Sequence, residues 1–161
     1  MKSEPRAEHK WLQQLIGEWT FESECQMGPG QPPAQTSGTE SVRSLGDLWV
    51  IGEGQGSMPG GGTCSMNITL GFDPAKARFV GTFIVAIMPG LWIYDGALDS
   101  TGRILTLDTE GPAMFANGTR RTRYQDIIEL PEGGGRLLRS RMLDEAGNWN
   151  EFMVAKYRRR T

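Results

Sequence analysis

Histidine and cysteine, the residues that most often bind metals or act as nucleophiles, are almost absent from this sequence of 161 residues. His9 is the single histidine, and Cys25 and Cys64 lie far apart with no Cys-x-x-Cys spacing. One histidine and two distant cysteines cannot supply the usual ligand set of a zinc site. We therefore expect no metal, and any catalytic triad or haem site would have to be built on His9 alone.

The sequence also lacks a large excess of charge of either sign and long hydrophobic runs. The chain has 17 Lys and Arg against 19 Asp and Glu, a net charge of −2, so no general basic field is available to hold nucleic acid. Residues 1–15 lack the apolar segment of a signal peptide. The longest apolar run, residues 79–94, is interrupted by glycine and proline and has a β-like composition, which argues against a membrane helix. We expect a cytoplasmic protein with two free thiols, no nucleic-acid partner and no membrane partner.

Glycine and proline are abundant instead. The 22 Gly and 9 Pro make up about a fifth of the chain, a load that a helical bundle would not carry because both residues destabilise helix interiors. The 5 Trp, 3 Tyr and 6 Phe, with 38% apolar residues overall, are enough to form a core, which excludes a disordered chain. This composition favours many short strands joined by turns in a single domain.

The periodicity predicts one helix followed only by strands. Residues 7–16 carry apolar side chains at Trp11, Leu12, Leu15 and Ile16, the spacing of an amphipathic helix, and Gly17 ends it. Residues 1–8 are polar and are expected to be disordered, and residues 9–161 are expected to form one domain. After the helix the hydrophobic period changes to two. The expected strands lie at about 19–27, 35–46, 48–57, 64–72, 78–88, 91–99, 103–110, 119–130, 136–144 and 148–158.

Strands this closely spaced can pair only antiparallel, because a parallel crossover needs a dozen or more residues. About ten such strands, filling most of the chain, are typical of a barrel, which closes the sheet and removes its edges. We therefore predict an all-β fold, a closed up-and-down antiparallel β-barrel with the short N-terminal helix at one end. A barrel of this size has a lumen that side chains fill or that holds one small ligand.

Several motifs in order resemble a known family. They are His9-Lys10-Trp11-Leu12 with Gly17-Glu18-Trp19, Gly71-Phe72-Asp73-Pro74, the run from Leu91 to Asp99, Glu110-Gly111-Pro112, and the ending Lys156-Tyr157-Arg158-Arg159-Arg160. Together they resemble the prokaryotic domain-of-unknown-function family 1579, whose members are similar to calycins such as the lipocalins. The chain departs from the family pattern at Phe83 and Val85, where a Trp and an Asp are expected. The resemblance implies a calycin-like barrel in which Trp19 packs against a basic residue of the last strand, Arg158 or Arg159, and we single out Arg158.

The alternation along each strand suggests which polar side chains face the lumen. If the tryptophans of three strands point inward, residues two positions away share their orientation; Tyr124 likewise shares parity with Asp126, and Arg139 with Arg141. The candidate ligand-binding residues are therefore Glu53, Trp92, Tyr94, Tyr124, Arg139, Arg141, Trp149 and Glu151. Two alternatives stay open: these groups could satisfy one another in a filled core, or a one-residue bulge could reverse the assignment.

Three functions fit such a barrel. The leading hypothesis is binding of a small apolar or amphipathic molecule in the lumen, without catalysis and without a cofactor. The second is an acid–base enzyme such as an isomerase, cyclase or hydrolase, using Glu53, Glu151, Asp126 or Tyr94. The third is an interaction protein with a filled barrel. His9 lies on the closing helix rather than in a strand, which argues against a Ser-His-Asp triad and against haem.

Residues 79–93 break the alternation by placing apolar groups on both faces of two neighbouring strands. The outward set would be exposed on a monomeric barrel, and an exposed apolar patch usually marks an interface. We therefore expect a homodimer that pairs through these strands, the alternative being that the N-terminal helix covers the patch.

Overall fold

The structure, a computed structural model, describes residues 1–114 and 120–160 of the chain. One helix precedes ten strands: α1 (Ala7–Gln13), β1 (Gly17–Cys25), β2 (Ala34–Leu45), β3 (Trp49–Ser57), β4 (Thr63–Asp73), β5 (Arg78–Val85), β6 (Trp92–Leu98), β7 (Ile104–Pro112), β8 (Arg121–Glu129), β9 (Arg136–Leu143) and β10 (Trp149–Arg159). The ten predicted strands are all present. Residue 119, the expected start of the eighth strand, and residue 161, the expected end of the domain, lie outside the described residues.

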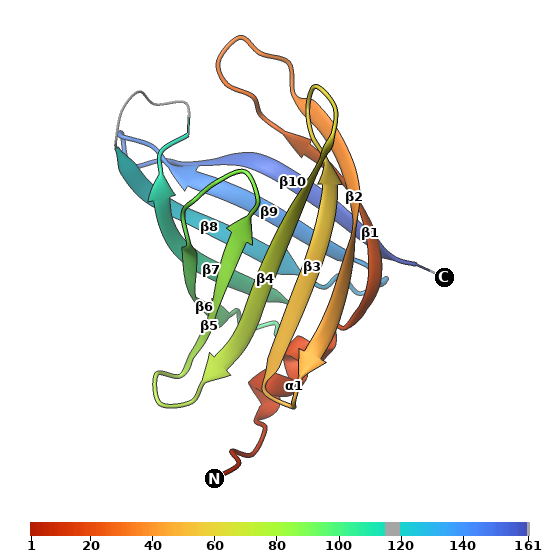
Figure 1. The fold of residues 1–161 in the computed structure, drawn as a ribbon. Helices are drawn as coiled ribbons and strands as arrows, with labels where there is room; N and C mark the ends of the chain where they lie inside the picture. The colour runs from red at the N-terminus through yellow and green to blue at the C-terminus, as the bar shows by residue number, and fades with distance from the viewer. Residues whose placement is uncertain (115–119, 161) are drawn as a thin grey trace.

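The strands form one closed barrel in which each pairs antiparallel with its neighbours in sequence, and β1 closes the circle with β10 (Figure 1). The predicted closed up-and-down barrel is thus confirmed. Its turns are tight because they carry residues suited to them. In the β6–β7 turn, Gly102 has φ 73° and its N–H donates to the Asp99 carbonyl, while the Asp99 carboxylate accepts from the Thr101 hydroxyl.

Helix α1 covers one end of the barrel, at the bottom of Figure 1. Its side chains Trp11 and Leu12, and Leu15 just after its end, are buried and belong to the main hydrophobic core. The Trp11 indole N–H donates to the Gly102 carbonyl at 2.6 Å, so the helix is tied to a turn at the same end. The barrel is therefore closed at this end by side chains of the helix and of the strands above it.

His9 anchors the helix to β4. Its Nδ1 accepts the backbone N–H of Arg6 at 2.9 Å, so Nε2 carries the ring hydrogen and donates to the Phe72 carbonyl at 3.0 Å. The ring is buried and meets the Phe72 ring edge-on, with centroids 5.8 Å apart. The single histidine thus packs the helix on the barrel and does not face the lumen.

Trp19 closes the barrel with Arg159 rather than with Arg158, which corrects one expectation. Trp19 lies directly opposite Arg159 in the β1–β10 ladder, so both side chains are on the same face, whereas Arg158 lies opposite Thr20 and faces outward. The Arg159 guanidinium carbon lies 4.3 Å from the centre of the Trp19 ring. Because successive residues of β10 point to opposite faces of the sheet, only Arg159, and not Arg158, can pack on Trp19.

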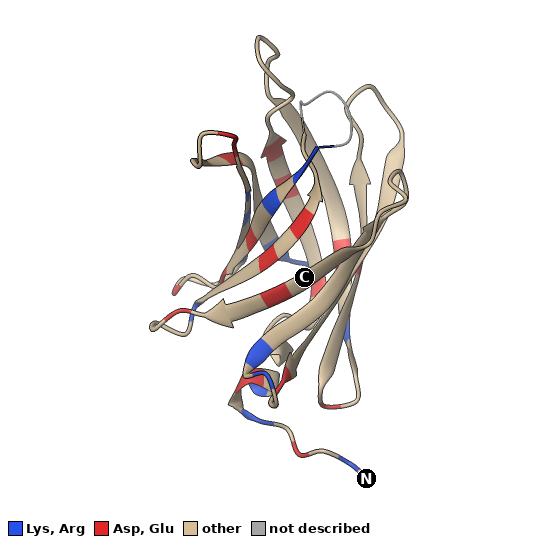
Figure 2. Cartoon of the chain, turned by 90° about the vertical axis from the view of Figure 1, so that its left-hand side faces the viewer, with Lys and Arg blue, Asp and Glu red and all other residues tan. Residues whose placement is uncertain are grey.

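The outer surface carries charges of both signs. Figure 2 shows acidic and basic residues scattered over one side of the barrel, with no region where basic residues alone gather. Exposed pairs such as Arg78–Asp95 and Arg103–Glu132 join neighbouring strands and turns. Within residues 1–114 and 120–160, the structure has no helix with the length and apolarity needed to cross a membrane.

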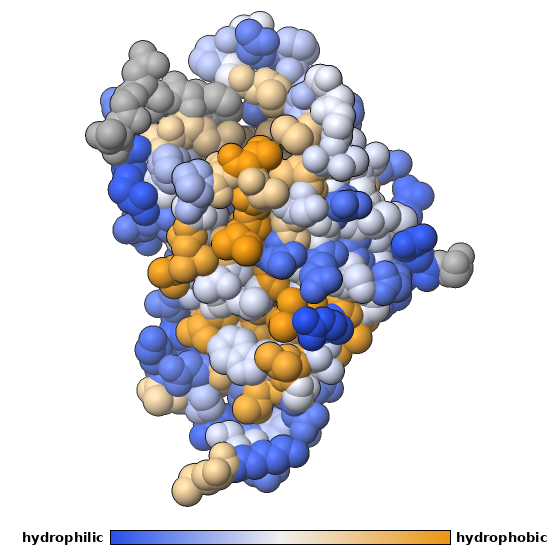
Figure 3. Space-filling view, viewed as in Figure 1, coloured by the Kyte–Doolittle hydropathy of each residue, from blue (hydrophilic) through white to orange (hydrophobic). Residues whose placement is uncertain are grey.

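One outer area is apolar. Figure 3 shows apolar side chains gathered on the face where β4 and β5 lie. Large apolar residues of β5, β6 and the loop between them are exposed, and we call this set the β5–β6 apolar surface; its members are Ile84, Ile87, Met88, Leu91 and Ile93. Ile93 is 64% exposed and Ile87 is 62% exposed. Helix α1 does not cover this surface in the described structure.

Candidate functional site

The inside of the barrel holds a cavity of about 350 Å³. It extends from Leu15 of the helix end to Met27 and Pro59 in loops at the opposite end. Most of its wall is apolar, contributed by Phe21, Val42, Val50, Met66, Ile68, Leu70, Phe83, Leu107, Ile128, Leu138, Met153 and Ala155. A cavity of this size and lining is typical of a small-molecule site.

Strand β3 leaves one side of the cavity without side chains. Its inward positions after Val50 are Gly52, Gly54 and Gly56, and two of them, Gly52 and Gly56, line the cavity. A Cβ atom at Gly56 would lie 3.3 Å from Phe21 Cζ and 3.5 Å from Met66 Cε. Any larger side chain there would enter the cavity, so the alternate glycines create part of its volume.

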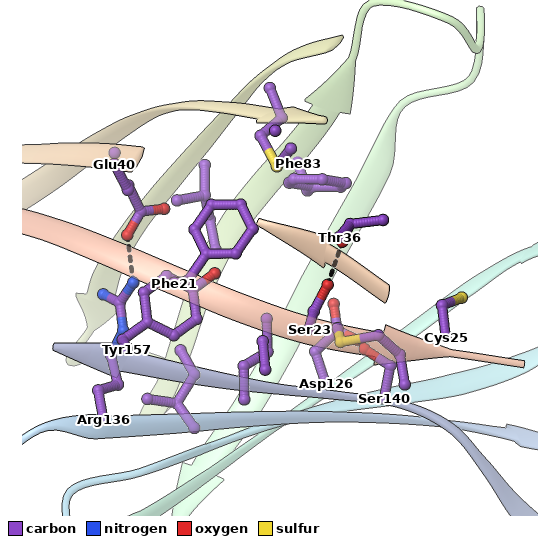
Figure 4. A pocket seen from close by; sticks show the side chains of 18 of the residues that line it. Phe21, Ser23, Cys25, Thr36, Glu40, Phe83, Asp126, Arg136, Ser140 and Tyr157 are labelled. Atoms are coloured by element: carbon purple, nitrogen blue, oxygen red, sulfur yellow. Dashed lines mark hydrogen bonds and ion pairs between the residues drawn. The ribbon is translucent and has the colours of Figure 1, made fainter. Parts of the chain in front are cut away.

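A buried ion pair lies at the helix end of the cavity. Glu40 of β2 and Arg136 of β9 are 96 positions apart, and their side chains, 10% and 7% exposed, form a hydrogen-bonded ion pair. The Arg136 guanidinium carbon also lies 3.8 Å from the Tyr157 ring centre and 4.8 Å from that of Trp19. Figure 4 shows the pair beside Phe21 and Tyr157. Pairing and stacking together offset the cost of burying these two charges.

A second polar group surrounds Asp126 of β8. The Tyr94 hydroxyl donates to Asp126 Oδ2 at 2.5 Å, and the Ser140 hydroxyl donates to Oδ1 at 2.6 Å. Burial raises the pKa of the Asp126 carboxyl, and the two hydrogen bonds only partly oppose this. Burial, together with the neighbouring Asp126 charge, raises the pKa of Tyr94 well above its usual value. A carboxyl and a phenol, whose pKa values are both raised by burial, therefore share one wall of the cavity.

Small polar groups and a thiol lie toward the open end. The hydroxyls of Ser23 and Thr36 hydrogen-bond to each other across β1 and β2, and Cys25 follows on the same face of β1 (Figure 4). Cys64 lines the cavity from β4, and both thiols are free. Burial raises the pKa of the Cys25 thiol, so this thiol is less ionised than an exposed one.

Three predicted site residues lie on the inner face. Tyr94 lines the cavity and binds Asp126. Tyr124 and Trp92 pack edge-to-face with ring centroids 5.1 Å apart, and neither is among the residues that line the cavity. The Tyr124 hydroxyl donates to the Pro112 carbonyl at 2.5 Å and accepts the Met114 N–H at 3.0 Å, so this phenol is already engaged. Ligand contact by these residues stays a prediction.

Glu53 lies outside the barrel, which corrects its expected orientation. In β3 the buried positions are Val50 and the glycines that alternate with it, so Trp49, Ile51 and Glu53 point outward. Trp49 covers Gly71 of β4, where a Cβ atom would lie 2.5 Å from the indole. A tryptophan was thus a misleading guide to the inner face, because a bare glycine on the next strand lets it pack on the outside.

Arg139, Arg141, Trp149 and Glu151 are also outside, against expectation. In β9 the cavity is lined by Arg136, Leu138 and Ser140, so the odd-numbered arginines face away. In β10 a β-bulge between Glu151 and Met153 shifts the parity, which separates Glu151 from the inward Met153. On the outer face, Arg139 pairs with Glu151 at 3.8 Å, and the Arg141 guanidinium lies 5.2 Å from the Trp149 ring centre.

Several polar residues that face the lumen were not predicted as site residues from the sequence. They are Glu40, Arg136, Ser140, Ser23 and Thr36. The alternation Gly52-x-Gly54-x-Gly56 was the one available signal for a bare inner wall. No local pattern links Glu40 to Arg136, because the two are brought together only by closure of the barrel. In the described part of the chain, no three His, Cys, Asp or Glu side chains are grouped so that they could hold a metal ion.

Comparison with known proteins gives a family and a fold. The sequence model of a family described as "Protein of unknown function (DUF1579)" matches residues 4–159. No curated protein matches the chain. A solved structure described as "Crystal Structure of Rv2717c from M. tuberculosis" is similar, with a TM-score of 0.66 and 14% identity over 98% of this chain and 100% of that one. At this identity the similarity extends to the fold alone.

Proposed function

The chain belongs to the DUF1579 family of proteins of unknown function, and we propose that its barrel binds a small apolar or amphipathic molecule in the lumen, without catalysis. One observation carries the proposal: the cavity of about 350 Å³ that the strands enclose. It lies within the size range of small-molecule sites, and its wall combines apolar side chains with a few polar groups. A filled barrel would have no such volume.

The arrangement of the lumen supports binding over nucleophilic chemistry. His9, the only histidine of the sequence, is used to pack the helix on β4 and cannot serve as a base in the cavity. Ser23 and Thr36 are paired with each other, and Ser140 donates to Asp126. Ser23 and Thr36 therefore act as hydrogen-bonding groups of the wall, and the Ser140 hydroxyl is held by the Asp126 carboxyl.

Native mass spectrometry of the purified protein tests this proposal. The mass under native conditions is compared with the mass after denaturation, and any released molecule is identified. Extra mass that disappears on denaturation supports lumen binding. A clean native mass, followed by failure of a panel of ten-carbon amphiphiles to bind in calorimetry, would contradict it.

The Tyr94–Asp126 pair supports a second candidate, an acid–base enzyme. Burial raises the pKa of Asp126, and such a shift is common for groups that exchange protons in catalysis. Both groups line the same cavity, so a bound substrate could meet the carboxyl. Identification of a ligand by native mass spectrometry followed by its conversion on incubation would favour this candidate. Recovery of the unchanged ligand favours simple binding.

We also propose that a second copy of the chain covers the β5–β6 apolar surface. Beside it lies a hollow lined by Leu91 and Ile93 together with acidic and basic groups, which are Asp108, Glu110, Arg121 and Arg123. A surface that carries apolar groups and both charges can be complementary to itself across a two-fold axis. The two free cysteines further support a cytoplasmic location for this dimer.

A further inference from the structure

The polar groups of the lumen differ in what they leave free for a ligand, and the following inference rests on the lumen binding proposed above. Arg136 is the only cationic side chain among the cavity-lining residues that the structure describes. It is ion-paired with Glu40, and its guanidinium lies against the rings of Tyr157 and Trp19. Its charge and its faces are thus used within the protein, and a carboxylate of a ligand would find no free cation there.

Asp126 is in the opposite situation. Each of its oxygens accepts one hydrogen bond, from Tyr94 or from Ser140, which leaves further lone pairs available. No ion pair reaches Asp126 in residues 1–114 and 120–160. Residues 115–119, Phe-Ala-Asn-Gly-Thr, carry no charged side chain by sequence.

The free face of Asp126 is turned toward the cavity. Its side chain is on the inner face of β8 and lines the cavity, yet the residue keeps part of its surface accessible. That surface is accessible from the lumen, where Met153 and Phe83 contribute apolar wall. A ligand in the cavity would therefore meet one acceptor group of negative charge within an otherwise apolar or neutralised wall.

We propose that the lumen selects amphipathic molecules ending in an amine, whose ammonium group pairs with Asp126, over molecules ending in a carboxylate. The ammonium group would donate to the unused lone pairs of Asp126 and supply the missing positive charge. A carboxylate would instead enter a lumen that already holds the carboxyl group of Asp126 without a counter-charge, and like charges repel. Since burial raises the pKa of the Asp126 carboxyl, its ionised form is destabilised in the empty lumen, and an ammonium partner would relieve this.

Three probes with the same chain test the selection: decylamine, decanol and decanoate, each titrated into the wild-type protein by calorimetry at neutral pH below its micelle concentration. We expect decylamine to bind about ten-fold more tightly than decanol, because a hydrogen bond to a charged group exceeds a neutral one. Decanoate is expected to bind more weakly than decanol. Decanoate binding as tightly as decylamine would overturn the inference and leave the proposed lumen binding intact.

Two variants locate the selection. Asp126→Asn keeps the size of the side chain and removes its charge, so the preference for decylamine over decanol should fall to about two-fold or less. Glu24→Gln removes the same charge from the exposed outer face of β1 and should leave the preference unchanged. A preference that survives Asp126→Asn would overturn the inference. If this variant does not fold by circular dichroism, the ranking of the three probes on the wild-type protein decides.

Failure of the underlying function gives a different result. If none of the three probes binds the wild-type protein, the lumen does not hold amphiphiles of this size, and both the proposed function and the amine selection are contradicted. If all three bind with equal affinity, the lumen binds apolar chains and only the selection is contradicted.

Discussion

Arg159 lies directly across the β1–β10 ladder from Trp19, with its guanidinium carbon 4.3 Å from the centre of the indole ring. The same guanidinium donates to the carbonyls of Ile16 at 2.8 Å and Gln14 at 2.7 Å, where helix α1 ends. Trp19 in turn donates its indole N–H to the Leu15 carbonyl at 2.9 Å. The last strand, the first strand and the helix are thus joined at one end of the barrel by two side chains.

Arg159→Ala should therefore destabilise the fold by about 1–2 kcal/mol, because it removes a cation–π contact and two charged hydrogen bonds. Arg158→Ala is the matched control: its side chain faces outward opposite Thr20, and its effect should stay within about 0.5 kcal/mol. Chemical denaturation followed by tryptophan fluorescence measures both. Equal effects of the two substitutions would refute this account of the closed end.

Gly56→Leu should fill the cavity. The new side chain would extend from the bare wall of β3 toward Phe21 and Met66, and we expect it to reduce the affinity for any lumen ligand by more than about ten-fold. Gln55→Leu adds the same side chain to the exposed outer face of the same strand and should leave binding unchanged. Calorimetry with decanol measures the difference. Undiminished binding by the Gly56→Leu protein would place the ligand outside the lumen.

Asp126→Asn should stabilise the folded protein at neutral pH. Burial raises the pKa of Asp126 in the folded state, so the folded chain holds this proton at a pH where the unfolded chain has lost it. Ionisation of this carboxyl therefore lowers stability as the pH rises from the pKa of an Asp in the unfolded chain, about 3.9, through the raised pKa of the folded state. We expect the variant to be more stable than the wild-type protein at pH 7, by a margin that shrinks as pH falls toward 4. Urea denaturation at several pH values measures it, and a gain that grows on acidification would have the wrong sign.

Alkylation of Cys25 should be slow at neutral pH. The thiol reacts as the thiolate, and burial raises the pKa of Cys25, so the reactive fraction is small. Iodoacetamide labelling of a Cys64→Ser protein, followed by mass spectrometry, gives its rate against that of a free thiol. We expect the rate to keep rising above pH 9 and to fall further when a lumen ligand is bound. Unfolding the same protein in urea should restore the ordinary rate, and a fast reaction in the folded state would contradict the burial of this thiol.

Ile93→Lys should dissociate the proposed dimer. Ile93 is 64% exposed on the β5–β6 apolar surface, and a charge there would have to be buried in the interface. Thr20→Lys adds the same charge to the exposed face of β1, on the opposite side of the barrel, and should change nothing. Light scattering after size-exclusion chromatography measures the mass. A wild-type protein that elutes as a monomer at high micromolar concentration would remove the dimer proposal.

The fold could be predicted from the sequence because its cause is local. Hydrophobic alternation with period two marks a strand wherever one face is buried, and short turns such as that around Gly102 allow only antiparallel pairing. Once about ten strands follow one another in this way, closure is the solution that leaves no exposed edge. The helix was equally visible, because Trp11, Leu12, Leu15 and Ile16 follow helical spacing, although the helix ends at Gln13 rather than at residue 16.

The site could be predicted only in part, because alternation gives two faces without saying which is inner. Tyr94 was placed correctly on the inner face. Glu53, in contrast, lies on the outer face of β3, whose inner positions after Val50 are glycines, and Glu151 precedes a bulge that reverses parity. Large apolar side chains do not indicate the inner face in a strand such as β3, because its inward positions are glycines and its tryptophan packs on the outside.

The sequence by itself thus determined the class of fold, the number and order of the strands, and the scarcity of histidine and cysteine that restricts the chemistry. Only the tertiary structure decided which charges meet. Glu40 and Arg136 are 96 positions apart and neutralise each other because closure of the barrel brings β2 and β9 within reach of one another. The same closure leaves Asp126 with two hydroxyl donors and no cation in the described structure. Such long-range pairing depends on register and curvature, which no local pattern encodes.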